Sequence, residues 1–290
     1  MYAYSNLRST RNDSGGNFRT AELKENRSTA IINNPNGSGN FLTAIDRFAI
    51  EHAVLPLFQH HEGSDLKIRI TDQNGANEQI ETIDFSPYID SNGFGYSYFD
   101  FLRALNTALS GLTLTGNLSF KLSSDSHLII TSDDSFNTNH RLYVNILWLS
   151  NFGFDYEGLH DLTKEYYRIF LNDGDNKSLE NMNALSPVDK LILTSNLSVH
   201  PESTTVDGEF SKSKSVILTD YQVKGTNPYM IHSIHYTALD GQYRLQTLNG
   251  HVTDTYDVKF KFTDFSGKEY DLKILNTGKL DMKIMFKKAE

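Results

Sequence analysis

Histidine and carboxylate side chains are the most obvious candidates for chemistry in this sequence. His60, His61 and Glu62 are consecutive, and His52 lies shortly before them. Imidazole and carboxylate groups are common metal ligands, so this cluster could suggest a metal site. Adjacent residues of an extended chain point to opposite sides, however, so His60 and His61 would not converge on one ion. We therefore interpret these histidines as structural or surface residues.

Other motifs for catalysis or cofactor binding are absent from the sequence. There is no phosphate-binding Gly-x-x-x-x-Gly-Lys-Ser/Thr, no Gly-x-Gly-x-x-Gly and no Gly-x-Ser-x-Gly. His232 and His235 are three residues apart, which is the wrong spacing for one face of a strand. Residues 72–75, Asp-Gln-Asn-Gly, resemble part of a calcium loop but lack its ligand spacing and its distant Glu. The prediction is a protein that is not an enzyme, with no catalytic residues, no metal and no cofactor.

Composition restricts the remaining classes. The chain has no cysteine, which excludes disulfides, thiolate metal sites and cysteine nucleophiles. Its formal net charge is −9, with acidic and basic residues interspersed, so it is a poor candidate for gripping nucleic acid over a wide surface. No apolar run approaches the roughly 20 residues that span a bilayer. The residues that follow Met1 are polar, and we expect neither a signal peptide nor a membrane span.

The last stretch, residues 256–288, alternates between apolar and polar side chains outside its turns, and only Met285 breaks the polar side. Because side chains alternate across a strand, the pattern predicts a three-strand meander with one buried face. Residues 264–267 and 276–278 are predicted to be its hairpin turns. A lone sheet cannot shelter its apolar face, so the rest of the chain must supply a second sheet. The charged face, suited to subunit contacts or to solvent, carries Lys259, Lys261, Lys273, Lys283, Asp257, Glu269, Asp271 and Asp281.

Short alternating stretches recur through the rest of the chain with turn residues between them. This pattern is typical of a sandwich or jelly roll. The exception is residues 97–109, where apolar residues recur at helical spacing and Ser97 can cap the helix. We expect this helix to plug one end of a β core. The predicted fold is all-β: a single jelly roll, meaning an eight-stranded antiparallel double sheet, with extra strands, one short helix near 97–109 and long loops.

Residues 1–40 differ from the remainder because polar and basic residues dominate them. Such a segment cannot build a core by itself. We predict an N-terminal arm over residues 1–40, extended or disordered, followed by a jelly-roll domain over 41–290 with elaborated loops, which should fold without the arm. On an arm that orders on a partner, the apolar residues would dock and the arginines would face acidic surface or packaged DNA. The candidate assembly residues are Arg8, Arg11, Arg19, Leu23, Ile31 and Ile32.

Several short phrases of the chain are similar, in the same order, to one family of viral proteins. They are residues 45–50 (Ile-Asp-Arg-Phe-Ala-Ile), 55–58, 188–197, 216–221, 258–264 and 282–288. Together they resemble the penton proteins, the vertex proteins of virophages and of Polinton-like and adenovirus-related double-stranded DNA viruses. The resemblance spans most of residues 41–290 and carries no active site.

The resemblance implies a structural capsid protein. Five copies of an upright jelly roll would form the penton at each five-fold vertex of an icosahedral virion. The implied partners are further copies of this chain, as a homopentamer, the neighbouring major capsid protein and, through the arm, packaged DNA. The implied location is the virion capsid, after synthesis in the interior of the host cell and without secretion through a signal peptide.

Two other function classes remain open from the residues alone. The first is a carbohydrate-binding β-sandwich of the lectin or fibre-head type, with exposed aromatics among Tyr88, Tyr96 and Tyr156. Trp148 with its neighbouring phenylalanines could form a sugar platform, or it could plug the core, as the apolar residues on both sides of it favour. The second is a cupin-like metalloenzyme, which would need histidines and a carboxylate that converge.

Overall fold

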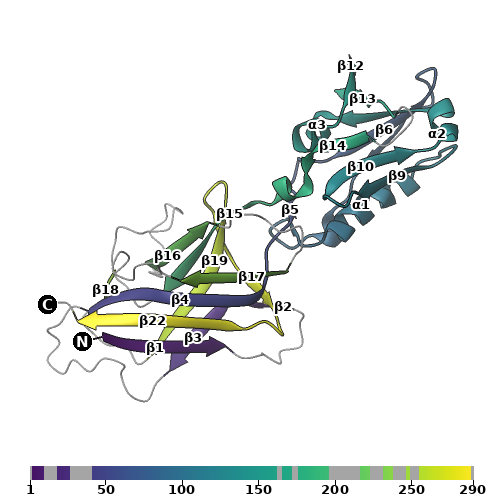
Figure 1. Ribbon diagram of the computed structural model, residues 1–290. Helices are drawn as coiled ribbons and strands as arrows, with labels where there is room; N and C mark the ends of the chain where they lie inside the picture. The colour runs from purple at the N-terminus through teal and green to yellow at the C-terminus, as the bar shows by residue number, and fades with distance from the viewer. Residues whose placement is uncertain are drawn as a thin grey trace. The chain divides into compact units, whose positions relative to one another are not determined.

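The chain divides into two compact units. The computed structural model describes residues 2–9, 18–26, 41–161, 165–171, 176–195, 216–222, 231–237, 246–248 and 255–288. Unit 1 comprises Met1–Leu55 and Val188–Glu290, and unit 2 comprises Pro56–Pro187 (Figure 1). The sequence had suggested one domain over 41–290, whereas residues 56–187 form a unit of their own. The chain passes between the units at Leu55–Pro56 and at Pro187–Val188. Neither position lies in a stretch with the composition of a linker, so the alternation patterns did not reveal these boundaries.

Unit 1 is a pair of antiparallel sheets (Figure 1). In the first sheet β1, β22, β4, β21 and β2 are neighbours in that order, and β17 and β18 also pair with β4. In the second sheet the order is β16, β15, β19 and β20, and β3 also pairs with β19. The strands are β1 (Tyr2–Ser9), β2 (Phe18–Thr20), β3 (Glu22–Asn26), β4 (Phe41–Val54), β15 (Val188–Ser195), β16 (Val216–Gln222), β17 (Ile231–Thr237), β18 (Gln246–Leu248), β19 (Thr255–Asp264), β20 (Glu269–Asp271), β21 (Lys273–Leu275) and β22 (Leu280–Lys288).

The core of unit 1 lies between these two sheets. Phe48 of β4 meets Phe260 of β19 edge to face, with ring centroids 5.6 Å apart, and stacks on Tyr236 of β17 at 5.1 Å. The alternation predicted for residues 256–288 is confirmed at the strand positions whose burial is described. The apolar side chains of the predicted inner face are buried, apart from the half-buried Tyr270, and the charged side chains of the opposite face are not. The buried set is Val258, Phe260, Phe262, Leu272, Ile274, Leu280, Met282, Ile284 and Phe286.

The predicted three-strand meander is wrong in its pairing. β19 and β20 do form a hairpin, with Lys261 opposite Asp271. After Leu272, however, the chain passes to the first sheet, where β21 and β22 both run antiparallel to β4 and follow one another along the same edge. Residues 276–278 therefore interrupt one long strand and do not reverse the chain. Alternation reports which side of a strand is buried, and the inner faces of both sheets border the same core, so the pattern continues across the change of sheet.

The N-terminal segment belongs to both sheets. β1 pairs with β22 from Tyr2 opposite Lys287 to Ser9 opposite Leu280, and β3 pairs with β19. Ala21, between β2 and β3, donates its N–H to Leu272 O at 2.7 Å and accepts the N–H of Phe260 at 2.9 Å. The N-terminal chain thus changes sheets beside the point where the C-terminal chain does the same. In their described part, residues 1–40 are strands of the chain's own fold and not a separate arm.

Unit 2 combines three small antiparallel sheets with short helices. The sheets have the orders β12-β13-β11-β6-β7, β14-β10-β9 and β5-β8. The elements are β5 (Phe58–Gln59), β6 (Lys67–Asp72), β7 (Gln79–Thr82), η1 (Ser86–Tyr88), β8 (Phe94–Gly95), α1 (Tyr98–Ser110), β9 (Leu118–Leu122), β10 (His127–Ser132), α2 (Asp134–Asn139), β11 (His140–Asn145), α3 (Ile146–Phe152), β12 (Tyr156–Asp161), β13 (Tyr166–Ile169), β14 (Asn176–Asn181) and η2 (Met182–Leu185).

The predicted helix is present as α1. Ser97 caps it, since its side chain accepts the N–H of Asp100 at 3.2 Å. Phe101 of α1 packs on Phe58 and Phe85, with ring centroids 5.0 and 5.1 Å away. The helix therefore packs into the aromatic core of unit 2, which differs from the role of a plug at one end of a β core that we had expected.

A fragment that contains only residues 56–187 is expected to fold by itself. Unit 2 has its own aromatic core, and its two ends meet, because Ser186 Oγ donates to Pro56 O at 3.0 Å. Dispersed amide signals in an NMR spectrum and a cooperative thermal transition would confirm this expectation. A fragment with the narrow amide dispersion of an unfolded chain would contradict it.

Three turns of the chain share one chemistry. In each, an Asp carboxylate accepts the backbone N–H two residues on, at 2.9 Å, and the one four residues on, at 2.8–3.2 Å. A glycine three residues after the Asp has a φ of 79–85° and closes the turn. The pairs are Asp72 with Gly75, Asp90 with Gly93, and Asp264 with Gly267. The stretch that resembled part of a calcium loop is thus a hairpin turn organised on the Asp72 carboxylate.

The Asp264 turn predicts a measurable pH dependence. Burial raises the pKa of Asp264, but hydrogen bonds from Ser266, Lys268 and Tyr270 outweigh it and lower the pKa. A lowered folded pKa means that this stabilisation is present above the unfolded value of about 3.9 and is lost as the pH falls through the folded value. Asp264→Asn should lose on the order of 1 kcal/mol at pH 7 and show a shallower loss of stability in acid.

Urea unfolding of both proteins between neutral and acidic pH measures this difference. Asp271→Asn, at an exposed position on the neighbouring β20, is the matched control and should behave as the parent does. Parallel stability curves for the parent and Asp264→Asn would show that the turn contributes nothing through its charge.

Candidate functional site

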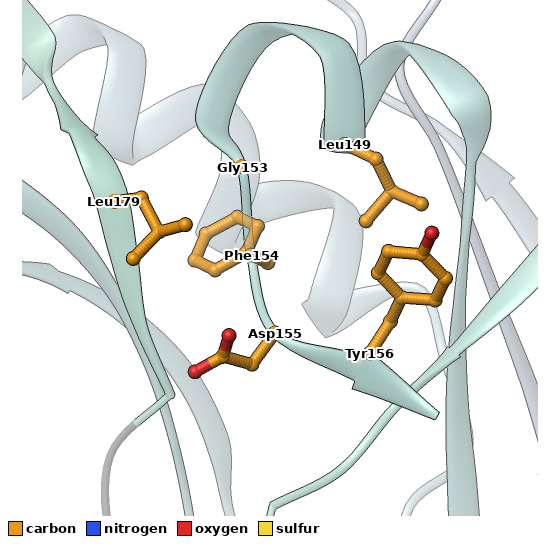
Figure 2. A pocket seen from close by; sticks show the side chains of 6 residues that line it. All are labelled: Leu149, Gly153, Phe154, Asp155, Tyr156 and Leu179. Carbon is orange, nitrogen blue, oxygen red and sulfur yellow. The ribbon is translucent and has the colours of Figure 1, made fainter. Parts of the chain in front are cut away.

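A hollow of about 280 Å³ opens on the surface of unit 2 (Figure 2). α3, β12 and β14 supply its walls. Figure 2 shows Leu149 and the Tyr156 ring on one side of Phe154, and Leu179 with the Asp155 carboxylate on the other. The six lining residues are Leu149, Gly153, Phe154, Asp155, Tyr156 and Leu179.

Local chain geometry explains why these residues gather. α3 ends at Gly153, which has a φ of 61° and donates its N–H to Leu149 O at 2.8 Å. The left-handed cap turns the chain sharply, so that Phe154 enters the core while Asp155 and Tyr156 remain exposed. A Cβ at Gly153 would meet Leu179 Cβ at 3.4 Å, which shows how closely β14 approaches this turn.

The surface around the hollow is unusually apolar for exposed positions. Leu179 is 69% exposed, Tyr156 48% and Ile146 49%. Ile146 lies one turn before Leu149 on α3, so the two side chains are neighbours on the same helical face. The Tyr156 ring is further held by an edge contact with Tyr167, at a centroid distance of 5.3 Å.

The structure places three of the six candidate assembly residues of the N-terminal segment. Leu23 is 2% exposed within its own chain, so it belongs to the core of unit 1. Arg19 is partly buried and donates from Nη2 to Gly278 O at 2.9 Å, and burial lowers the pKa of its guanidinium. Arg8 lies on β1 opposite Asp281. The other three candidates, Arg11, Ile31 and Ile32, lie outside the described residues.

The histidines do not form a metal site within the described ranges. His60 approaches Asp65 at 3.6 Å and packs beside the Phe85 ring, while His61 is exposed. His235 is exposed as well. No group of three His, Cys, Asp or Glu side chains in the described part of the chain could hold a metal ion.

Most of the aromatic residues considered for sugar binding are buried or half-buried within the fold. Trp148 is 0% exposed and stacks on Phe120 at 5.2 Å, so it is a core residue and the platform interpretation is wrong. Tyr96 donates its hydroxyl to Asp90 at 2.9 Å, and burial together with that carboxylate raises its pKa. Tyr88 is half-buried, which leaves Tyr156 as the candidate that is well exposed.

The charged face of the C-terminal strands carries several ion pairs within the chain. Lys261 contacts Glu269 at 2.9 Å, and Lys283 contacts Asp46 at 3.0 Å. Lys259 lies 3.8 Å from Glu22 of β3. Ion pairs at the surface are worth about 0–1 kcal/mol each, and these partly exposed pairs fit a solvated face as readily as a subunit contact.

The fold defines the class of protein: an all-β jelly roll of two antiparallel sheets, elaborated by a second unit. It is similar over its full length to the mavirus penton protein, with 21% sequence identity, a TM-score of 0.78 and complete coverage of both chains. It is also similar to a chain in the structure of the Sputnik virophage, with 17% identity, a TM-score of 0.65 and coverage of 98% of this chain and 97% of that chain.

These likenesses confirm the predicted fold class and the resemblance to penton proteins at the level of the fold. No family model and no curated protein matches the sequence. In the described residues, no helix is long and apolar enough to cross a membrane.

Proposed function

We propose that this chain is a structural capsid protein that forms the penton, the pentameric vertex of an icosahedral virion. The observation that carries the proposal is the match to the mavirus penton protein, which extends over the whole of both chains and therefore includes both units. The match to a chain of the Sputnik virophage structure supports the same role. Fold alone does not determine function, so the assembly itself must be tested.

The described side chains fit a role in assembly better than one in chemistry. Histidines and carboxylates are dispersed, and the Trp148 cluster is part of the core. A ring of five copies needs contacts in which one side of a subunit fits the other side of its neighbour. We propose that the partners are further copies of this chain and a neighbouring major capsid protein, and that the protein resides in the virion, without an enzymatic activity.

Fewer residues remain candidates for contacts with DNA or with a neighbouring subunit than the sequence suggested. Arg19 donates to a backbone carbonyl of its own chain, and Leu23 is buried. Arg8 and Arg11 remain the candidates for acidic surface or DNA. The apolar candidates for docking on a neighbouring subunit are now Ile31 and Ile32.

Native mass spectrometry of the purified full-length protein tests the central proposal. We expect a complex with the mass of five 32.9 kDa chains, and five-fold symmetric particles in electron micrographs. The matched control is the same protein in mild denaturant, which should give single chains. A monomer, or a closed ring of another number of copies, at every concentration studied would contradict the pentamer.

A further inference from the structure

We propose that Asn74 is a site of spontaneous modification, at which deamidation and isoaspartate formation replace the side-chain amide by a carboxylate. The inference concerns one hairpin turn of unit 2 and does not rest on the proposed capsid role. Asparagine followed by glycine is especially prone to this reaction, because glycine puts no side chain in the path of the attacking nitrogen. Four such pairs occur in the chain, and Asn74-Gly75 and Asn92-Gly93 lie within the described residues.

The reaction needs only water and the groups of the turn itself. The backbone nitrogen of Gly75 attacks Cγ of the Asn74 side chain and loses its proton, and the side-chain nitrogen leaves as ammonia. The product is a cyclic succinimide. Water then adds to either carbonyl carbon of the ring and opens it, which gives aspartate or, where the chain continues through the side chain, isoaspartate.

The Asn74-Gly75 peptide is held only by its own turn. Both residues are exposed, and a Cβ at Gly75 would have no atom within 4 Å. Asn74 and Ala76 donate their N–H groups to the Asp72 carboxylate at 2.9 and 2.8 Å, and Gly75 donates to Asp72 O at 3.0 Å. The Gln73 side chain does bond to Asn137 O and His140 O, but these bonds leave the next peptide free to rotate.

The Asn92-Gly93 turn has the same internal bonds but is also held from outside. Gly93 O accepts the N–H of His60 at 2.9 Å, and Asn92 O accepts from Gln59 Nε2 at 3.4 Å. A Cβ at Gly93 would lie 2.2 Å from His60 O, so the two backbones are in close contact. Ring closure must turn the Asn-Gly peptide out of its hydrogen bonds. At Asn92 this movement separates β8 from β5, whereas at Asn74 it only opens a loop.

The modification would change the β6–β7 hairpin in two ways. It places a new carboxylate beside that of Asp72, so that like charges meet in one turn. Isoaspartate also adds a methylene to the backbone between the N–H groups of Asn74 and Ala76, which the Asp72 carboxylate binds together. Among the described strands β7 pairs with β6 alone, so we expect the disturbance to stay at this edge of the sheet.

The test is an incubation of the full-length protein at mildly alkaline pH, followed by digestion and mass spectrometry. We expect the peptide that contains Asn74 to deamidate about tenfold faster, or more, than the one that contains Asn92, since an exposed turn opens more easily than a packed one. Fragmentation spectra distinguish isoaspartate from aspartate at the modified position. In urea both asparagines should convert at similar rates, because neither turn is then folded.

Two variants assign the fast conversion to one residue. Asn74→Gln should abolish it in the folded protein while the melting temperature stays that of the parent, because glutamine must close a larger ring and reacts far more slowly. Asn92→Gln is the matched control, and the fast conversion should remain unchanged in it.

Two results would overturn the proposal. Equal rates at Asn74 and Asn92 in the folded protein would show that the contacts of Gly93 with His60 give no protection. Conversion of Asn74 in urea but not in the folded protein would show that the Asp72 turn keeps the peptide from reacting.

Discussion

Replacing Phe260 with alanine is expected to lower the free energy of unfolding by about 3–5 kcal/mol, the largest effect of any single substitution that we predict. Phe260 is 1% exposed and lies between the two sheets, where it meets Phe48 edge to face. Its removal leaves a cavity in a close-packed core that relaxes only in part. Urea unfolding, followed by far-ultraviolet circular dichroism, measures the loss.

The adjacent Lys259→Ala is the matched control for Phe260→Ala. The Lys259 side chain is 41% exposed and contacts Glu22 at 3.8 Å, so its removal should change stability by no more than about 0.5–1 kcal/mol. If Phe260→Ala unfolds at the same urea concentration as Lys259→Ala, the assignment of the inner face of β19 is wrong.

Deletion of residues 1–26 is expected to prevent unit 1 from folding, although the sequence suggested that the body would fold without its first forty residues. The deletion removes β1 from the whole length of β22 and β3 from β19. It also removes the buried Leu23 and the Ala21 backbone, which hydrogen-bonds to Phe260 and Leu272 where the chain changes sheets. Unpaired buried backbone groups and exposed strand edges both destabilise the folded state and favour aggregation.

Soluble yield and amide hydrogen exchange of β19 and β22 measure the effect of this deletion. Two point variants give a graded version of the test. Leu23→Ala should cost about 2–5 kcal/mol, whereas Phe18→Ala, at a side chain that is 43% exposed, should cost at most about 0.5 kcal/mol. If the truncated chain has the same unfolding curve as the full-length protein, residues 1–26 do not contribute to the fold and this prediction is wrong.

Features that depend on residues close together in the chain could be predicted from the sequence. The alternation along residues 256–288 identified the buried side of each C-terminal strand, because side chains alternate across a strand whatever it pairs with. The spacing of apolar residues and the Ser97 cap identified α1, since both signals act within a few residues. The all-β class and the resemblance to penton proteins followed from the same local patterns.

Which strands pair, and how the chain divides into two units, was decided only by the tertiary structure. Leu272 carries the chain from one sheet to the other without a break in alternation, so β21 and β22 lie along β4 and not beside β19. The N-terminal strands find partners more than 200 residues away, as Tyr2 does at Lys287, and no local pattern specifies such a partner. The hollow of unit 2 likewise depends on Leu179 reaching the turn after α3. These features depend on contacts between segments far apart in the chain, and a periodic pattern contains no information about which segments will meet.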